Sequence, residues 1–158
     1  PASTPRAQDA AGRIRLAVPA EREALEALQL RASLRNPGDR EALLANPDAI
    51  ELPADQILAG HVIVVEDGGA IQGFAAILPR DDGDAELDAL FVEPVTWRRG
   101  YGRALVEHGV TMARDRHARA LHVIGNPHAE RFYLACGFET TGRVATRFGD
   151  GLLMRRPL

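Results

Sequence analysis

The chain has 158 residues, of which 46% are hydrophobic and 26% charged, which is the size and composition of one globular domain. Its formal net charge of −3 argues against a general electrostatic attraction to nucleic acid or to an anionic membrane surface. All nineteen cationic side chains are arginines, and the lack of lysine excludes a Walker A nucleotide site and a Schiff-base mechanism.

The sequence also lacks the residue patterns of other common kinds of active site. The only serines, Ser3 and Ser33, lie in no Gly-x-Ser-x-Gly sequence, so serine hydrolase chemistry is not expected. The five histidines form no His-Glu-x-x-His pattern and Cys136 is the only cysteine, so we expect neither a metal site nor an internal disulfide. No apolar run is long enough to span a bilayer and no signal core opens the chain, which predicts a cytoplasmic protein. A homodimer is left open.

The N-terminal part predicts a tail, a strand and helices. Residues 1–12 are rich in Ala, Ser, Pro and Asp without an apolar period, so we expect a mobile tail there and a single domain over residues 13–158. Ile14–Val18 alternates apolar and charged residues like a strand, and Pro19–Ala32 has apolar residues at helical spacing. Two short helices bounded by Pro or Gly are expected at Arg40–Ala45 and Pro53–Ala59.

Three strands are predicted next. The sequence Asp67-Gly68-Gly69 predicts a hairpin between the strands Val62–Glu66 and Ile71–Leu78. Ala85–Val92 is the following strand, which ends before Glu93-Pro94.

A glycine-rich and arginine-rich loop, Trp97-Arg98-Arg99-Gly100-Tyr101-Gly102-Arg103-Ala104-Leu105, leads from this strand into a helix that is expected to reach Arg116. Glycines allow a tight turn whose backbone N–H groups approach an anion closely. The first turn of the helix offers its unpaired N–H groups and the positive end of its dipole to the same anion. The loop therefore predicts a pyrophosphate site, to which Arg98, Arg99 and Arg103 add charge.

The last predicted elements surround a second motif, which runs from Asn126 to Phe138. A short apolar strand, Leu121–Ile124, precedes it, and Asn126 with Pro127 suits a helix start that Gly137 would end. The final strands are expected from Phe138 onward and around Leu152–Arg155. This order of elements predicts an α/β sheet flanked by helices.

Together the loop and the second motif resemble the GNAT superfamily of acyl-CoA-dependent N-acyltransferases. The phosphate loop of that superfamily reads Gln/Arg-x-x-Gly-x-Gly/Ala, and its later block commonly reads Asn-x-x-Ala-x-x-Phe-Tyr-x-x-x-Gly-Phe. Gly100 and Gly102 fill the small positions, the later block matches at every such position, and Trp97 stands where Gln or Arg is usual. The resemblance is strong from about Glu86 to Phe138 and architectural before that. It implies an α/β (α+β) fold with a mixed, mostly antiparallel central sheet, flanked by helices and splayed at the acyl-CoA site.

Acetyl-CoA is the co-substrate that the resemblance implies. Its pyrophosphate is expected on the loop and the first helical turn, formed by Arg98, Arg99, Gly100, Tyr101, Gly102, Arg103 and Ala104. Backbone amides of Leu90, Phe91 and Val92 are expected to bind the pantetheine arm and the thioester carbonyl. Cofactor contacts are also expected from Asn126, Ala129, Phe132 and Tyr133.

Tyr133 is the expected general acid, which protonates the departing thiolate as the matching tyrosine does in many family members. Glu86 and Asp88 lie two residues apart on one strand, and either is a candidate base. Glu86 falls where some protein-acetylating relatives carry a catalytic Glu, whereas Asp88 lies nearer the expected thioester. The alternative is an acidic rim that attracts a cationic substrate while water accepts the proton.

The expected reaction is transfer of the acetyl group from acetyl-CoA to a primary amine, by direct attack in a ternary complex. A small-molecule acceptor is the first expectation, and neither nucleic acid nor a membrane is an expected partner. A protein or peptide acceptor, which needs a long open groove, and a catalytically inert acyl-CoA-binding domain are the alternatives. Residues 19–59 and the last strands would select the acceptor, and there the resemblance gives no residue-level match.

Overall fold

The computed structural model describes residues 12–36, 39–46 and 48–158, so the predicted tail lies, apart from Gly12, outside the described residues. The strands are β1 (Arg13–Leu16), β2 (Val62–Asp67), β3 (Ala70–Pro79), β4 (Ala85–Val92), β5 (Ala120–Gly125), β6 (Glu139–Thr146) and β7 (Gly149–Pro157). The helices are α2 (Arg22–Arg35), α3 (Asp39–Ala45), α4 (Ala54–Leu58), α5 (Tyr101–Asp115) and α6 (Glu130–Ala135), with 3-10 turns η1 (Pro19–Glu21), η2 (Pro94–Thr96) and η3 (Pro127–Ala129). None of the described helices has the length and apolar character needed to cross a membrane.

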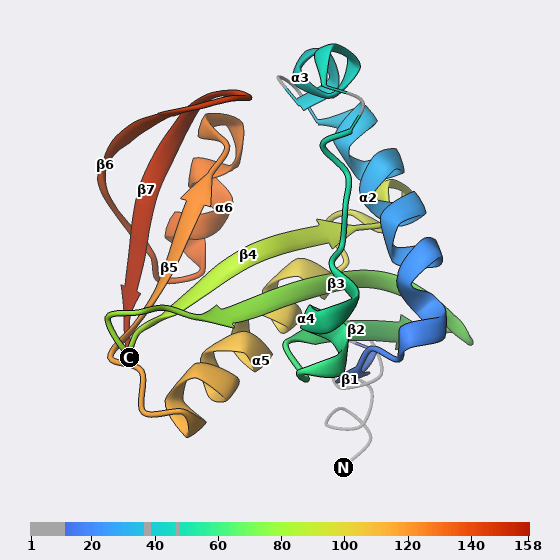
Figure 1. Cartoon of the computed structure of the whole chain (residues 1–158), viewed down its shortest axis with the longest axis horizontal. Helices are drawn as coiled ribbons and strands as arrows, with labels where there is room; N and C mark the ends of the chain where they lie inside the picture. Colours follow the sequence, from blue (N-terminus) through green and yellow to red (C-terminus); the bar gives the residue numbers. More distant parts are fainter. Residues whose placement is uncertain (1–11, 37–38, 47) are drawn as a thin grey trace.

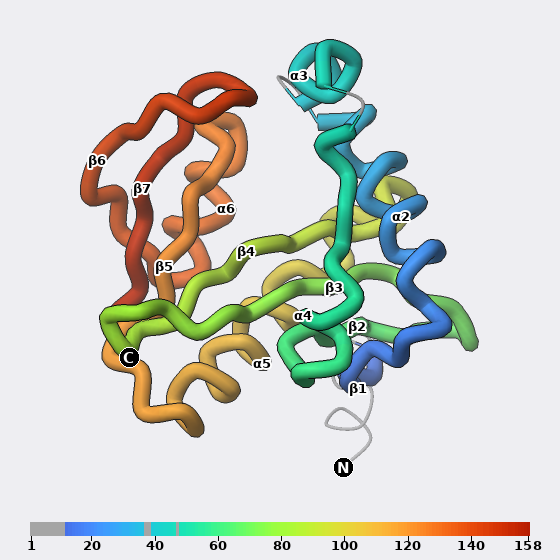
Figure 2. Tube along the Cα trace, viewed as in Figure 1, coloured from blue at the N-terminus to red at the C-terminus, as the bar shows by residue number. Residues whose placement is uncertain are grey.

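One seven-stranded sheet organises the chain, in the order β1-β2-β3-β4-β5-β7-β6. Every neighbouring pair is antiparallel except β4 with β5, which confirms the mixed, mostly antiparallel sheet. The parallel pair is joined only at Ala85 with Leu121 and at Glu86 with His122. Beyond these residues β4 and β5 diverge, so that the sheet opens like a fork (Figure 1). This fork is the expected splay, and it separates the β5–β7–β6 wing from the rest of the sheet (Figure 2).

Alternating side chains of β2 pack into two cores on opposite faces of the sheet. Ile63 and Val65 join the core that α5 covers, whereas Val62 and Val64 join the core beneath α2 and α4. The four valine and isoleucine side chains are at most 1% exposed, as expected for a strand that is buried on both faces. Helices therefore lie on both sides of the sheet and fix the position of β4 between them.

The predicted hairpin between β2 and β3 is present, and its turn consists of two residues. Gly68 and Gly69 have φ angles of 63° and 79°. Positive φ at both central positions defines the hairpin turn that suits the twist of a sheet, and glycine adopts it without a steric penalty.

The first predicted helix differs from the structure at both ends. Its start is a 3-10 turn, where the Glu21 carboxylate accepts a 2.9 Å hydrogen bond from the Val18 N–H. Its end lies at Arg35 instead of Ala32. The added turn brings Ser33, which is 8% exposed, to the wall of the cavity described below.

Candidate active site

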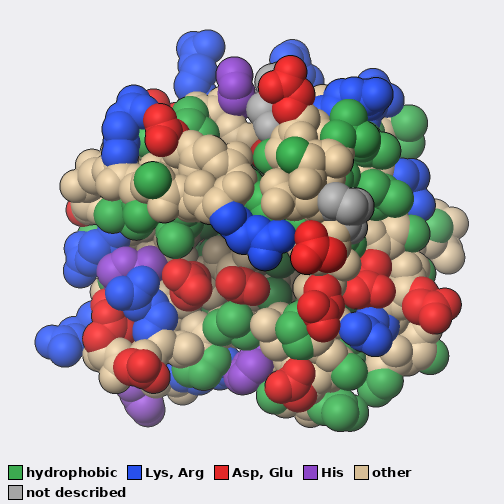
Figure 3. Space-filling model, turned by 45° about the horizontal axis from the view of Figure 1, so that its top comes forward, with side chains coloured by type: hydrophobic (Ala, Val, Ile, Leu, Met, Phe, Trp, Pro, Cys, Tyr) green, Lys and Arg blue, Asp and Glu red, His purple; other side chains and the backbone are tan. Residues whose placement is uncertain are grey.

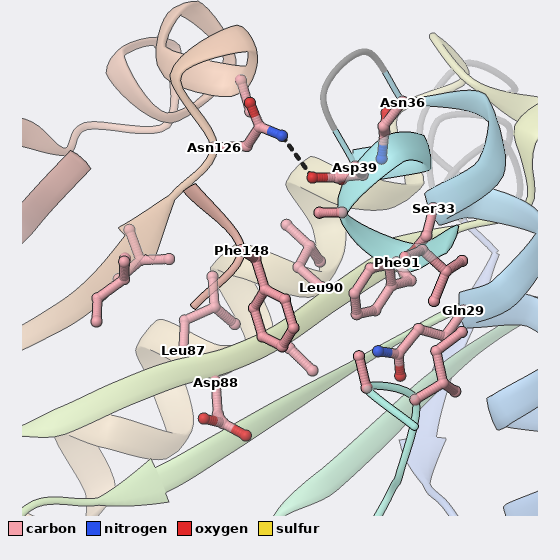
Figure 4. A pocket seen from close by; sticks show the side chains of 18 of the residues that line it. Gln29, Ser33, Asn36, Asp39, Leu87, Asp88, Leu90, Phe91, Asn126 and Phe148 are labelled. Atoms are coloured by element: carbon pink, nitrogen blue, oxygen red, sulfur yellow. Dashed lines mark hydrogen bonds between the residues drawn. The ribbon is translucent and has the colours of Figure 1, made fainter. Parts of the chain in front are cut away.

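A cavity of about 380 Å³ lies where β4 and β5 diverge. Its walls come from α2 and α3 on one side, from β4 below, and from β5, η3, α6 and the β6–β7 turn on the other side. Figure 3 shows the corresponding hollow in the middle of one face, with acidic side chains beside it. Figure 4 shows the side chains that line the cavity.

A β-bulge in β4 shapes the floor of the cavity. Leu87 pairs with Ile77 and Ala89 pairs with Ala76, so Asp88 has no partner on β3. The extra residue reverses the alternation of side chains along the strand. Ala85 and Leu87 belong to the α5 core before the bulge, whereas the even-numbered Leu90 and Val92 pack against that core after it. The bulge thus makes Asp88 part of the cavity wall.

The two candidate bases lie in different surroundings. Asp88 lines the cavity, whereas Glu86 does not and instead has an oxygen 3.9 Å from a guanidinium nitrogen of Arg80. Among the described residues, the Asp88 carboxylate has no hydrogen-bond or ion-pair partner. The side chain is reached by solvent, yet the surrounding protein displaces enough water to raise its pKa. Asp88 is therefore the better placed of the two to accept a proton from a ligand in the cavity.

Tyr133 lies on α6 and lines the same cavity with only 8% of its surface exposed. Phe132 and Phe138 pack edge-on against its ring, at centroid distances of 5.2 and 5.5 Å. Burial raises the pKa of Tyr133 well above its usual value, and the charges of Cys136 and Asp39 raise it further. No described residue forms a hydrogen bond with its hydroxyl. The phenol therefore keeps its proton at neutral pH.

Asn126 connects the two sides of the cavity. Its side-chain oxygen accepts a 2.9 Å hydrogen bond from the His128 N–H, which confirms the predicted cap. Its side-chain nitrogen donates a 2.6 Å hydrogen bond to an Asp39 oxygen on α3 (Figure 4). Burial raises the pKa of Asp39 above its usual value, and hydrogen bonds with Asn126 and Asn36 only partly oppose this effect. The sequence did not single out Asp39, because an acidic residue that begins a short helix is typical of a cap.

Other cavity residues were missed for a similar reason. Gln29 and Ser33 lie in the polar part of an ordinary helix, and Phe148 lies in the turn between β6 and β7. None of them belongs to a motif, and the only signal in the sequence would have been their place in segments expected to select the acceptor.

The predicted anion site lies at the start of α5. Gly100 is the N-cap residue with φ 88°, a left-handed conformation that glycine adopts readily. The Arg98, Arg99 and Arg103 side chains are exposed around it, and Arg98 has the left-handed φ of 72° despite its side chain. Backbone N–H groups of the first helical turn, together with these guanidinium groups, suit a bound pyrophosphate.

Two residues of this loop also have packing roles. A Cβ atom on Gly102 would lie 3.2 Å from Cζ of Phe132, so the glycine also permits α5 and α6 to approach each other. The Tyr101 side chain is 3% exposed and its hydroxyl donates a 2.5 Å hydrogen bond to Asp67. Only the main chain of Tyr101 is therefore available to a ligand. The half-buried Ala104 lies three residues further along α5.

The three β4 residues predicted to bind the pantetheine arm differ in the direction of their backbone N–H and C=O groups. The Glu93 N–H donates to the Gln72 carbonyl, so Val92 and Gly73 form a pair whose own N–H and C=O groups point away from each other. The backbone N–H and C=O groups of Leu90, two residues earlier, likewise point away from β3. Those of Phe91 point toward β3 and pair with Phe74. The free edge of β4 thus presents backbone groups of Leu90 and Val92, and Phe91 contributes its side chain to the cavity wall.

A group of possible metal ligands lies away from the cavity. Atoms of Asp82, Asp84 and His122 come within 4.8 Å of one another, and the described residues contain no other such group. Arg80 binds Asp82, and the Arg119 N–H and His122 bind Asp84. Hydrogen bonds within the protein therefore account for this group.

Comparison with protein families identifies one match. The model of the acetyltransferase (GNAT) family matches residues 25–138 of the 158, a range that contains β4, the loop, α5, Asn126 and Tyr133. No curated protein sequence matches the chain significantly.

Solved structures with this fold are numerous. A GCN5-related N-acetyltransferase from Rhodopseudomonas palustris has 19% identity and a TM-score of 0.74, over 93% of this chain and 96% of that one. The PaiA N-acetyltransferase from Thermoplasma acidophilum, solved in complex with coenzyme A, has 14% identity and a TM-score of 0.75, over 92% and 98% of the two chains. A ribosomal-protein-alanine N-acetyltransferase from Brucella melitensis has 26% identity and a TM-score of 0.67, over 92% and 99%.

Proposed function

The chain belongs to the acetyltransferase (GNAT) family, and we propose that it transfers an acetyl group from acetyl-CoA to the primary amine of a small molecule, by direct attack in a ternary complex. The observation that carries this proposal is the cavity at the fork of β4 and β5. It has an unpartnered carboxylate, Asp88, and a protonated phenol, Tyr133, in its walls. The predicted pyrophosphate loop leads from the end of β4, which forms the floor of this cavity, into α5.

The cofactor would occupy the fork from the loop toward the bulge. Its pyrophosphate would accept hydrogen bonds from the first turn of α5, with Arg98, Arg99 and Arg103 adding charge. Its pantetheine arm would run along the free edge of β4. The Trp97 indole already donates a 2.8 Å hydrogen bond to the Val92 carbonyl, so Val92 would offer its N–H alone. The Leu90 N–H, just after the bulge, would then stabilise the oxyanion of the tetrahedral intermediate.

The reaction removes two protons from the acceptor nitrogen. An ammonium group first gives one proton to Asp88, directly or through water, and the neutral amine attacks the thioester carbonyl to form the C–N bond. As the intermediate collapses the C–S bond breaks, and Tyr133 gives its proton to the departing sulfur. The second nitrogen proton passes to solvent, from which Tyr133 regains the one it gave, and Asp88 releases its proton to solvent. Asp88 suits its role because a raised pKa makes the carboxylate a stronger base.

Two contacts across the cleft support a small acceptor. Asn126 on one side binds Asp39 on the other at 2.6 Å. Arg147, in the β6–β7 turn, lies 3.3 Å from Asp48 in the segment after α3. Together they bridge the space where a peptide acceptor would need a continuous open groove.

Thiol release tests the proposal. Purified protein with acetyl-CoA should release CoA in the presence of one or more small amines and not with buffer alone. Peptides with free N-termini serve as the second arm, and a clear preference for them would contradict the small-molecule assignment. Calorimetric titration provides the cofactor control. Binding of CoA without any amine-dependent thiol release across the whole panel would instead identify an inert acyl-CoA-binding domain.

A further inference from the structure

We propose that the acceptor carries a second cationic group besides the amine that is acetylated, and that Asp39 binds this group as a specificity-determining residue. The inference rests on the proposed function, since it concerns the acceptor of that same cavity. It names a substrate class, a dicationic amine with an apolar linker.

The charge of the cavity wall is the first observation. Among the described residues, the charged ones that line the cavity are Asp39 and Asp88. The nearby Arg147, whose guanidinium lies 4.6 Å from the ring centroid of the lining Phe148, is paired with Asp48. Two carboxylates in a wall without an arginine favour a ligand that brings positive charge with it.

The hydroxyl of Tyr133, a residue only 8% exposed, faces the same cavity without a hydrogen-bond partner among the described residues. The Tyr133 hydroxyl and the Asp88 carboxylate are therefore both available to a ligand, whereas Asp39 already accepts a hydrogen bond from Asn126.

The chemistry of the reaction explains why one carboxylate is not enough. The reacting amine must lose its charge before it attacks the thioester, so an ion pair with it weakens along the reaction. A second ammonium group that takes no part in bond formation stays charged throughout. Binding energy from such a remote group holds the reacting nitrogen in place.

The hydrogen bonds of the two carboxylates assign their roles. Burial raises the pKa of both carboxyls, but Asp39 also accepts a 2.6 Å hydrogen bond from Asn126, and donors of this kind stabilise the anionic form. Asp88 accepts no hydrogen bond from the described residues. Asp39 therefore suits a lasting ion pair, and Asp88 suits proton transfer.

The space between the carboxylates determines the kind of linker. Leu90 and Phe148 lie between Asp39 and Asp88 in Figure 4, and both line the cavity. Phe148 is 44% exposed although it is a large apolar side chain. A short methylene chain would cover both side chains and connect the two ammonium groups.

The test compares three acceptors of equal length: an α,ω-diaminoalkane, the amino alcohol with a neutral hydroxyl in place of one amine, and the n-alkylamine. Chain lengths of three to six carbons are compared. We expect kcat/KM for the best diamine to exceed that for its amino alcohol by about tenfold or more, and this ratio to fall at high salt. Asp39→Asn should reduce the ratio about tenfold, because Asn126 can still donate to the new side chain while the charge is gone. The control Asp81→Asn, exposed in the β3–β4 turn, should keep the ratio.

The outcomes separate this inference from the proposed function. Equal kcat/KM for diamine and amino alcohol, or an equal loss with both in Asp39→Asn, would overturn the inference while CoA release upheld acetyl transfer. If no acceptor releases CoA, acetyl transfer fails, and calorimetry of the same compounds on the CoA-bound protein decides the inference alone. Tighter binding of the diamine that depends on Asp39 would support it, and equal binding would reject it. Melting temperatures of both variants check that each is folded.

Discussion

The indole N–H of Trp97 donates a 2.8 Å hydrogen bond to the Val92 carbonyl and so ties the loop before α5 to the end of β4. In the family this loop position usually holds Gln or Arg. Trp97 places a neutral ring there, 38% exposed, and holds it by an indole hydrogen bond. The positive charge that faces a bound pyrophosphate is then expected from the arginines that follow.

Replacing Trp97 by Phe should loosen the loop. The change removes one hydrogen bond and leaves the Val92 carbonyl to solvent, so we expect a loss of about 0.5–1.5 kcal/mol in the free energy of unfolding. Affinity for CoA should fall as well, because the loop is less well ordered before binding. Urea titration and calorimetry measure the two effects. Unchanged values for both would show that the Trp97 hydrogen bond does not organise the loop. Trp97 is the only tryptophan, so its fluorescence also reports cofactor binding in the unmodified protein.

Arg98→Gly should change stability and affinity in opposite directions. Glycine adopts the left-handed φ of 72° at this position without strain, so the variant should not lose stability and should gain up to about 1 kcal/mol. The lost guanidinium should weaken CoA binding by about 1.5–3 kcal/mol if it makes a charged hydrogen bond, and less at high salt. Arg143→Ala, on the exposed side of β6, is the control for a general loss of positive charge. Equal CoA affinity in Arg98→Gly and the unmodified protein would remove Arg98 from the cofactor site.

Tyr133→Phe should lower kcat far more than it lowers cofactor affinity. The ring still fills its place between Phe132 and Phe138, whereas the proton for the departing sulfur is gone. General acid catalysis is worth about 10²- to 10⁴-fold, and a thiolate is a good leaving group, so the low end is expected. Steady-state kinetics and calorimetry on both proteins provide the test. Full kcat in the variant would mean that water protonates the thiolate.

Tyr101→Phe should have the opposite character and is the matched control for Tyr133. Its hydroxyl donates to the Asp67 carboxylate, so the loss should lower the free energy of unfolding by about 1.5–3 kcal/mol. The effect on kcat should be small compared with that of Tyr133→Phe. A larger loss of kcat than of stability would place the Tyr101 side chain in the reaction.

Asp88 should make both activity and stability depend on pH. Because its pKa is raised in the folded protein, kcat/KM should fall as the pH drops through that raised pKa and the base is protonated. In the folded state the carboxyl also binds its proton more tightly than in the unfolded state. The contribution of Asp88 to the free energy of unfolding therefore decreases as the pH rises from its pKa in the unfolded state to its pKa in the folded state. Above the folded-state pKa the contribution stays at this lower value. Asp88→Asn should accordingly melt at a higher temperature at pH 7, show no such gain at pH 3, and be much less active. A lower melting temperature at pH 7 would show that Asp88 contributes to folding.

The sequence by itself determined the features that depend on local spacing. Residues Asp67 to Gly69 fixed the hairpin because only glycines adopt its two positive φ angles freely, and the bounds of β4 were predicted to the residue. The loop around Gly100 and the block from Asn126 to Phe138 indicated the family for the same reason, since their chemistry lies within a few neighbouring residues.

Only the tertiary structure decided which of the candidate residues meet. A bulge opposite Ile77 put Asp88 and not Glu86 into the cavity, and the pairing register turned the polar groups of Leu90, but not those of Phe91, to the free edge. The contact between Asp39 and Asn126 joins residues 87 positions apart. No local pattern encodes such a contact, because it depends on how the fork of the sheet holds α3 on one side of the cavity and the end of β5 on the other.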